Sequence, residues 1–195
     1  MPYRHLIAPL LIVLLLALLP AAFTDLLRYE RASVDQGEVW RLLSASWVSL
    51  GFMHAALNSG ALLLLWCLAR HDWTPFYWWL TLIVTGAGVH IALWFMSPES
   101  HWAVGLSGAL HGLAVVVIAI CRSLPLTVRA LAPLLIGVKA IGENYGFVPV
   151  ASETLIGGHV LVQAHLYGWM IGLALLFLFM GFNVWQRASP RPTAS

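Results

Sequence analysis

The chain has 195 residues, of which 61% are hydrophobic and only 9% are charged. A soluble globular domain carries about 25% charged residues, so this composition excludes that class. The formal net charge of +2 comes without a basic stripe, so the sequence gives no indication of nucleic-acid binding. We expect one all-α membrane domain that takes up residues 1–195 and has lipids as its surroundings.

Six apolar stretches follow one another along the chain, and each approaches the length of about 20 residues that crosses a hydrocarbon core. They cover about 6–23, 47–68, 76–96, 103–120, 130–147 and 160–182. The first also has features of a signal peptide, with Arg4 before it and Pro20-Ala21-Ala22 near a cleavage site. Its apolar run is longer than a signal core, so we prefer an uncleaved span. The sequence thus predicts a polytopic bundle of six transmembrane helices.

Charged residues set the expected orientation of this bundle. If the N-terminus is cytoplasmic, that side holds Arg4, Arg70, Arg122, Arg129, Arg187 and Arg191 against Asp72. The opposite side holds Arg28, Arg31 and Arg41 against Asp25, Glu30, Asp35, Glu38, Glu99 and Glu153. Lys and Arg favour the cytoplasmic side, so both termini are expected there. Cys67 and Cys121 then lie at cytoplasmic span ends, where a structural disulfide is not expected.

Four polar residues fall at similar depth in three separate spans. The run Gly105-Leu106-Ser107-Gly108 opens the fourth span, and His165 lies within the first two turns of the sixth. His54 and Asn58 lie about two and three turns into the second span. Each of these spans enters from the outer face, and polar residues at membrane depth face the bundle interior or a water-filled cavity. The pattern predicts a site beneath the outer surface.

These residue types suit nucleophilic catalysis. A serine hydroxyl needs an adjacent base, and His165 is the candidate base for Ser107. The Ser107 amide at a helix N-terminus is a candidate donor to an oxyanion. His54 and Asn58, four residues apart on one helix face, are candidates for further donors.

Glycines beside the serine and the histidine predict a close approach of two helices. Gly105 allows a sharp turn before the fourth span, and we assign Gly105 and Leu106 to the substrate-binding edge of the site. Gly108-x₃-Gly112 and Gly168-x₃-Gly172 are small-residue faces that let helices pack closely. Such packing is needed if the side chains of Ser107 and His165 are to share a hydrogen bond.

Structural interpretations of the same residues remain open. Ser107 alone could bond its own backbone, His165 alone could be a packing residue, and Asn58 alone could bridge two helices. Their matching depth and the flanking glycines together favour the catalytic interpretation.

Three further polar residues are expected to be structural. His111, one turn beyond the serine, is expected to bridge helices or line the cavity. Lys139 and Glu143 are spaced i, i+4 in the fifth span, which favours an ion pair that faces the bundle. A role of this pair in substrate handling is the alternative.

The motifs together resemble the rhomboid family of intramembrane serine proteases over about residues 38–172. They are Trp40-Arg41, His54-x₃-Asn58, Gly105-x-Ser107-Gly108, and His165 followed by Gly168 and Gly172. The resemblance implies a Ser107–His165 dyad with no third acidic member, and no metal or cofactor. It also implies substrates that are membrane-anchored proteins, cut near the outer face of a span.

Within that family the chain most closely resembles the rhombosortase branch. The motifs are Leu110-His111-Gly112, Lys139 with Glu143, and Leu155-Ile156-Gly157-Gly158. Two positions depart from common patterns: Ser49, where many rhomboids have another histidine, and Gly142, where an aromatic residue often precedes the acid. The branch implies a multi-pass protein of the bacterial inner membrane whose site opens outward. Its implied clients are exported single-span proteins whose C-terminal tail has a Gly-Gly motif, a transmembrane helix and a basic end.

Three alternatives accompany this interpretation. One is a general bacterial rhomboid with other clients, and another is a non-catalytic rhomboid-like protein that binds membrane helices. The third is a small transporter or metal site built on His54, His90, His111 and His165. The sequence places no cysteine or carboxylate at the depth of these histidines, which disfavours a metal.

Overall fold

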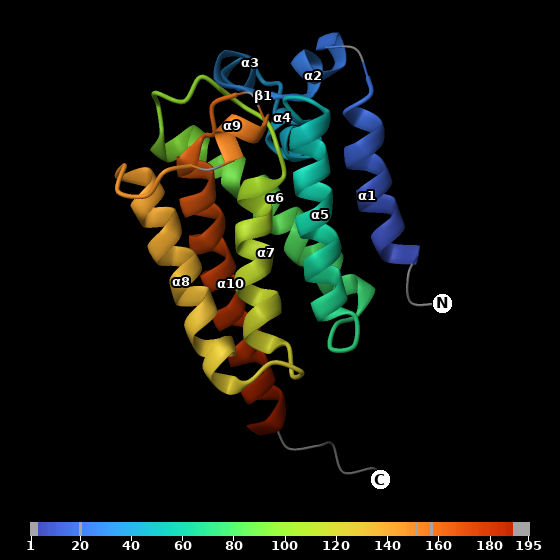
Figure 1. The fold of residues 1–195 in the computed structure, drawn as a ribbon, viewed down its shortest axis with the longest axis vertical. Coiled ribbons are helices and arrows are strands. Elements are labelled where there is room, and N and C mark those ends of the chain that lie inside the picture. The colour runs from blue at the N-terminus through green and yellow to red at the C-terminus, as the bar shows by residue number, and fades with distance from the viewer. Residues whose placement is uncertain (1–3, 20, 151, 157, 189–195) are drawn as a thin grey trace.

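The computed structural model describes residues 4–19, 21–150, 152–156 and 158–188 (Figure 1). Pro20, Gly157 and Arg191, which enter the sequence arguments, lie outside this part of the chain. The long helices are α1 (Arg4–Leu16), α5 (Phe52–Ala69), α6 (Pro75–Met96), α7 (Ser107–Ile120), α8 (Leu126–Asn144) and α10 (Val162–Ala188). The short elements are α2 (Ala21–Leu27), β1 (Tyr29–Glu30), α3 (Arg31–Asp35), α4 (Arg41–Ser44), the 3₁₀ helix η1 (Ala45–Trp47), β2 (Trp102–Ala103) and α9 (Ser152–Ile156).

Three of the six expected spans are supported by helix length and composition within the described residues. They are α5, α6 and the segment Val162–Gly181 of α10. Helix α1 has 13 residues and α7 has 14. At 1.5 Å per residue, each extends only about 20 Å, less than the hydrocarbon thickness of about 30 Å. Helix α8 has 19 residues but carries Arg129, Lys139 and Glu143.

Several expected boundaries are wrong. The first span ends at Leu16 rather than 23, and the second begins at Phe52 rather than 47, because residues 45–47 form η1. The fourth begins at Ser107 rather than 103, the fifth covers Leu126–Asn144 rather than 130–147, and α10 continues past 182. Apolar composition does not distinguish a helix from the extended chain that leads into it, so these limits could not be set from hydropathy.

The later start of α5 also corrects the expected depth of its polar residues. His54 is the third residue of α5 and Asn58 the seventh, so they lie in its first and second turns. Ser107 is the first residue of α7, and His165 is the fourth of α10. All four remain near the N-terminal ends of their helices.

A layer of short elements covers one end of the bundle, at the top of Figure 1. Strands β1 and β2 pair antiparallel, with Tyr29 opposite Ala103. Arg41 is buried and its guanidinium bonds the Glu38 carboxylate at 2.5 Å and the Asp25 carbonyl at 2.7 Å. Trp40, by contrast, is half exposed at the start of α4. The Trp-Arg motif therefore fixes this layer mainly through its arginine.

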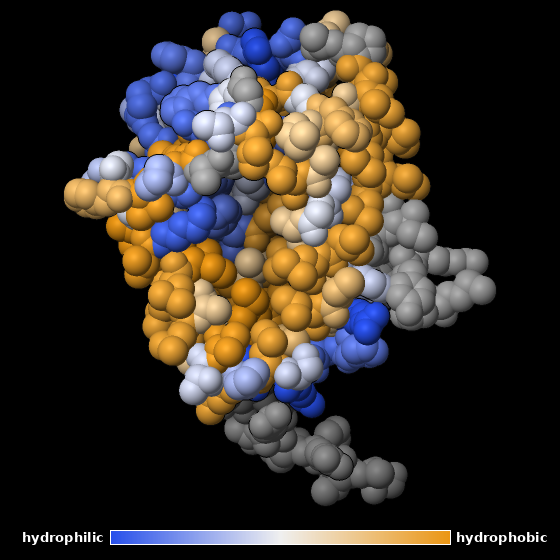
Figure 2. All heavy atoms as spheres, viewed as in Figure 1, coloured by the Kyte–Doolittle hydropathy of each residue, from blue (hydrophilic) through white to orange (hydrophobic). Residues whose placement is uncertain are grey.

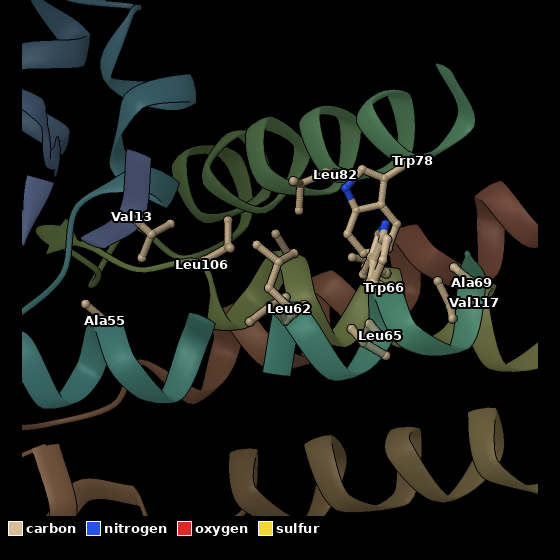
Figure 3. Close-up of a cluster of buried hydrophobic side chains, with 13 residues drawn as sticks. Val13, Ala55, Leu62, Leu65, Trp66, Ala69, Trp78, Leu82, Leu106 and Val117 are labelled. Atoms are coloured by element: carbon tan, nitrogen blue, oxygen red, sulfur yellow. The ribbon is translucent and has the colours of Figure 1, made fainter. Parts of the chain in front are cut away.

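Helix α7 lies at the centre of the bundle and packs most extensively against α10. Figure 3 shows one part of its surroundings, where Leu62 and Trp66 of α5 lie near Trp78 and Leu82 of α6. Val117 of α7 belongs to the same buried cluster. Since lipid tails are as apolar as these side chains, tight packing rather than escape from water stabilises such a core.

The outer surface is apolar around the middle of the bundle. On the face that Figure 2 draws, orange residues cover most of the middle, a hydrophilic patch interrupts them on the left, and further hydrophilic residues gather at the upper left and at the bottom. Leu64 on α5, Leu135 on α8 and Phe177 on α10 are each more than 60% exposed. Apolar side chains turned outward on long helices are typical of a surface that faces lipid. The chain is a membrane protein.

Candidate functional site

Ser107 begins α7 at the end of a tightly constrained segment. Gly105 has φ +112°, which L side chains rarely adopt, and its N–H donates to the Ala45 carbonyl at 2.9 Å. A Cβ at Gly105 would lie 2.6 Å from Cε1 of His54. Leu106, fully buried, is the residue that caps the helix. Glycine is therefore required at 105 both by the backbone angle and by the imidazole beside it.

Helices α7 and α10 cross at backbone contact through the expected glycines. A Cβ at Gly108 would lie 2.7 Å from the Ala164 carbonyl oxygen, and one at Gly112 would lie 2.5 Å from that of Gly168. A Cβ at Gly168 would overlap the Gly108 carbonyl oxygen, and one at Gly172 would lie 2.5 Å from that of Gly112. No side chain larger than hydrogen fits at these positions without separating the helices.

This close approach brings the serine and the sixth-span histidine together. Nε2 of His165 lies 3.2 Å from Oγ of Ser107. His165 is buried, whereas Ser107 is partly accessible. The two residues are 58 positions apart in the sequence, so their contact depends on the packing of α7 against α10.

The other nitrogen of His165 contacts a carboxylate. Nδ1 lies 3.0 Å from Oε2 of Glu143, whose Oε1 accepts a hydrogen bond from Nζ of Lys139 at 2.8 Å. The expected Lys139–Glu143 ion pair is present. Two expectations are corrected: an acidic residue does contact the histidine of the expected dyad, and a carboxylate does lie at the depth of the histidines. The i, i+4 spacing shows partners only within α8, whereas this contact joins α8 to α10.

His111 lies against the same imidazole. Its ring stacks on that of His165, with centroids 4.1 Å apart and an interplanar angle of 19°. Nδ1 of His111 lies 2.8 Å from the Ser107 carbonyl oxygen, and Nε2 lies 3.3 Å from Nζ of Lys139. His111 thus bridges α7, α8 and α10 at the site.

A cavity of about 400 Å³ opens beside Ser107. His54 lines it together with the serine, whereas Asn58 is not among its lining residues in the described chain. Gly105, which the sequence assigned to the edge of the site, is also part of the wall. Two segments that the sequence did not mark as part of a site, residues 99–104 and 159–164, provide most of the rest together with Ile156. Loops of mixed polarity carry no periodic signal, so only the packed chain identifies them as cavity walls.

At the rim of the cavity, a partly buried carboxylate contacts an exposed imidazole. Oε1 of Glu153 accepts a hydrogen bond from the Val160 amide at 2.8 Å and lies 2.6 Å from Nδ1 of His159. These two hydrogen bonds, the Val160 amide first, lower the pKa of the Glu153 carboxyl. They hold α9 against the segment that leads into α10.

The four histidines of the metal alternative are not all brought together. His90 is buried and bonds the Gly86 carbonyl at 2.9 Å on its own helix. Among the described residues, the group with metal-ligand proximity is His111, Glu143 and His165, whose ligand atoms lie within 4.8 Å of one another. Nζ of Lys139 is a fixed cation that already contacts two of the three residues.

Comparison with known proteins agrees with the motifs and their arrangement. A family model described as the Rhomboid domain matches residues 36–182. Rhomboid-like protein 11, chloroplastic, from Arabidopsis thaliana is 25% identical over 150 residues, which cover 73% of this chain and 53% of the relative. The chain therefore spans about half the length of this curated relative. Because the family model matches most of the chain, including all the motifs around Ser107, the protein belongs to the rhomboid family.

Proposed function

We propose that the protein is an intramembrane serine endopeptidase in which Ser107 is the nucleophile and His165 the general base. The observation that carries the proposal is the 3.2 Å contact between Oγ of Ser107 and Nε2 of His165 beside a cavity. An imidazole within hydrogen-bond reach of a serine hydroxyl is the arrangement that activates this nucleophile. The family match adds a precedent for proteolysis within the membrane.

The reaction uses the two side chains in turn. Oγ of Ser107 bonds to the scissile carbonyl carbon as its proton passes to Nε2 of His165, and the carbonyl oxygen becomes negative. The C–N bond then breaks, and the same proton goes to the leaving amine. Water next attacks the ester and gives one proton to His165. The C–Oγ bond breaks and Ser107 recovers that proton. No metal or cofactor enters this scheme.

The N–H of Ser107 and two side chains of α5 are the proposed donors to the oxyanion. The Leu50 N–H donates to Nδ1 of His54 at 3.3 Å, so the hydrogen of a neutral ring lies on Nε2, beside Gly105. Nδ2 of Asn58 is buried and has no hydrogen-bond partner in the described part of the chain. A buried amide without a partner is costly to a fold, which suits a donor kept for a reaction intermediate.

We expect His54→Ala and Asn58→Ala each to lower the rate of the chemical step by about 10²–10³-fold, the effect of losing one oxyanion donor. Single-turnover cleavage by the purified variants measures that step. Ser59→Ala, next to Asn58 on another face of α5, is the control and should cleave at the wild-type rate. Full chemical rates in both test variants would show that these residues are structural.

The proposed topology has six spans, both termini in the cytoplasm and a site that opens to the outer face of a bacterial inner membrane. The uneven distribution of arginines between the two sides supports it. The cavity is lined by β2, which belongs to the layer of short elements, and this position supports a mouth that opens to the outer face. Membrane lipids and single-span client proteins are the proposed partners.

The proposed clients are those of the rhombosortase branch, whose tails carry a Gly-Gly pair just before a C-terminal span. Glycines give up helical geometry at little steric cost, so such a pair exposes backbone to a nucleophile near the outer face. The motif Leu110-His111-Gly112 and the Lys139–Glu143 pair support this branch.

The test is a neutral exported reporter that carries such a tail, incubated with the purified protein in lipid vesicles. We expect one cut at or next to the glycines, and severely slowed cleavage when leucines replace both glycines. Sequencing of the new N-terminus locates the cut. Equal cleavage of the leucine tail would reject the rhombosortase branch and leave a general rhomboid protease. If the protein cut neither this reporter nor any of a panel of reporters with other membrane anchors, that result would contradict proteolysis itself.

A further inference from the structure

Glu143 is a buried acid whose two carboxylate oxygens have different partners. Its side chain is 3% exposed, and a charge at this depth is costly unless it is paired. Lys139 satisfies Oε1 at 2.8 Å. The ion pair alone does not account for Oε2, which lies 3.0 Å from Nδ1 of His165.

The contacts of this cluster indicate which nitrogen of each imidazole carries the hydrogen. A carboxylate oxygen only accepts, so Nδ1 of His165 carries its hydrogen and Nε2 offers a lone pair to Ser107. The Ser107 carbonyl also only accepts, so Nδ1 of His111 carries a hydrogen and its Nε2 accepts from Lys139. Each hydrogen bond along the chain Lys139, Glu143, His165 and Ser107 then joins one donor to one acceptor, without conflict.

We propose that Glu143 is a positioning residue for the reaction: it holds His165 in the tautomer that can accept the Ser107 proton, and it stabilises the imidazolium that results. This inference rests on the proposed protease function. The carboxylate keeps its negative charge throughout, since the proton that His165 gains lies on Nε2 and later passes to the leaving amine. The site thus works as a Ser107–His165–Glu143 triad drawn from α7, α10 and α8.

Lys139 and the stacked ring of His111 hold the parts of this triad in place. Lys139 is half exposed and reaches both Glu143 and His111. The rings of His111 and His165 lie nearly parallel, so their lone pairs point along separate planes rather than toward a shared centre. That geometry suits a hydrogen-bonded network and not a metal held by both histidines, since ligand lone pairs must converge on an ion.

Glu143→Gln tests the tautomer directly. The Lys139 ammonium binds the amide oxygen, so the amide NH₂ group faces Nδ1 of His165 and makes that nitrogen the acceptor. The hydrogen then lies on Nε2, which can no longer take the Ser107 proton. We expect kcat to fall by about 10²–10⁴-fold with little change in KM, as loss of the acid does in other serine protease triads.

The matched variant adds Lys139→Met to Glu143→Gln. Without the ammonium the amide is free to rotate and accept from Nδ1, so we expect kcat to recover by about tenfold or more over Glu143→Gln. Lys139→Met alone controls for loss of the ion pair. Failure of the double variant to recover would assign Glu143 to stability only and overturn the proposal.

A second readout does not depend on proteolysis, and its main observation is made on the wild-type protein. Nitrogen NMR of histidine-labelled wild-type protein in micelles reports which nitrogen of His165 carries the hydrogen; Ser107→Ala and His165→Ala help to assign its signal. We expect hydrogen on Nδ1, and on Nε2 in Glu143→Gln. Hydrogen on Nε2 in the wild-type protein, or an unchanged kcat in Glu143→Gln, would overturn the role of Glu143 while leaving the protease intact. Absence of cleavage by wild-type protein with hydrogen on Nδ1 would instead overturn the proposed function on which the role rests.

Discussion

Ser107→Ala and His165→Ala are each expected to lower client cleavage by about 10³-fold or more, because each removes one half of a unit that transfers a single proton. The 3.2 Å contact makes the two losses interdependent. The double variant should therefore be little worse than either single variant. Single-turnover cleavage of a Gly-Gly-tailed reporter in vesicles measures all three rates.

Two control substitutions keep this experiment specific. Ser123→Ala replaces an exposed serine beyond the opposite end of α7, and His71→Ala replaces an exposed imidazole beyond the C-terminal end of α5. Both control variants should keep a cleavage rate close to that of the wild type. All variants should elute from a size-exclusion column at the volume of the folded wild-type protein. If the rate decrease of the double variant equalled the product of the two single decreases, Ser107 and His165 would act separately.

Gly168→Ala is expected to damage both stability and activity. The added Cβ would overlap the carbonyl oxygen of Gly108, and neither backbone can turn away as a flexible side chain would. Overpacking of this kind costs about 1–3 kcal/mol or more, so we expect a lower midpoint of thermal unfolding. Separation of α7 from α10 also lengthens the serine–histidine contact, and a displacement of 1 Å at a catalytic group costs about 10²-fold in rate.

Gly181→Ala is the matched control on the same helix. A Cβ at this position meets no atom within 4 Å, and alanine favours a helix over glycine by about 1 kcal/mol. This variant should keep or raise the unfolding midpoint and keep its activity. If Gly168→Ala behaved in the same way, the close approach of the two helices would not be what holds the site together.

The association of Ser107 with His165 could be expected from the sequence because polar residues are rare and costly in membrane helices. Two such residues at equal depth, each beside a small-residue face, have few arrangements open to them. The same reasoning gave the Lys139–Glu143 pair, since a spacing of four residues places both side chains on one face. Depth in the spans and helical spacing were therefore enough to predict these two contacts.

Contacts between distant elements and helix limits required the folded chain. The spacing along α8 cannot reveal that the second oxygen of Glu143 reaches His165 on α10. The start of α7 at Ser107 depends on the pairing of β2 with β1 and on the positive φ of Gly105, neither of which alters hydropathy. Much of the cavity wall comes from the chain around β2 and just before α10, whose packing has no sequence period.

Labelling of the purified protein with a fluorophosphonate, followed by intact mass and peptide mapping, tests the central proposal most directly. The reagent forms a bond only with a serine oxygen that a neighbouring base activates. We predict one adduct per chain, on Oγ of Ser107, with slower labelling in His165→Ala and none in Ser107→Ala. Labelling that persists in Ser107→Ala, or a wild-type protein that is folded in vesicles yet takes up no label, would contradict an activated serine at this site.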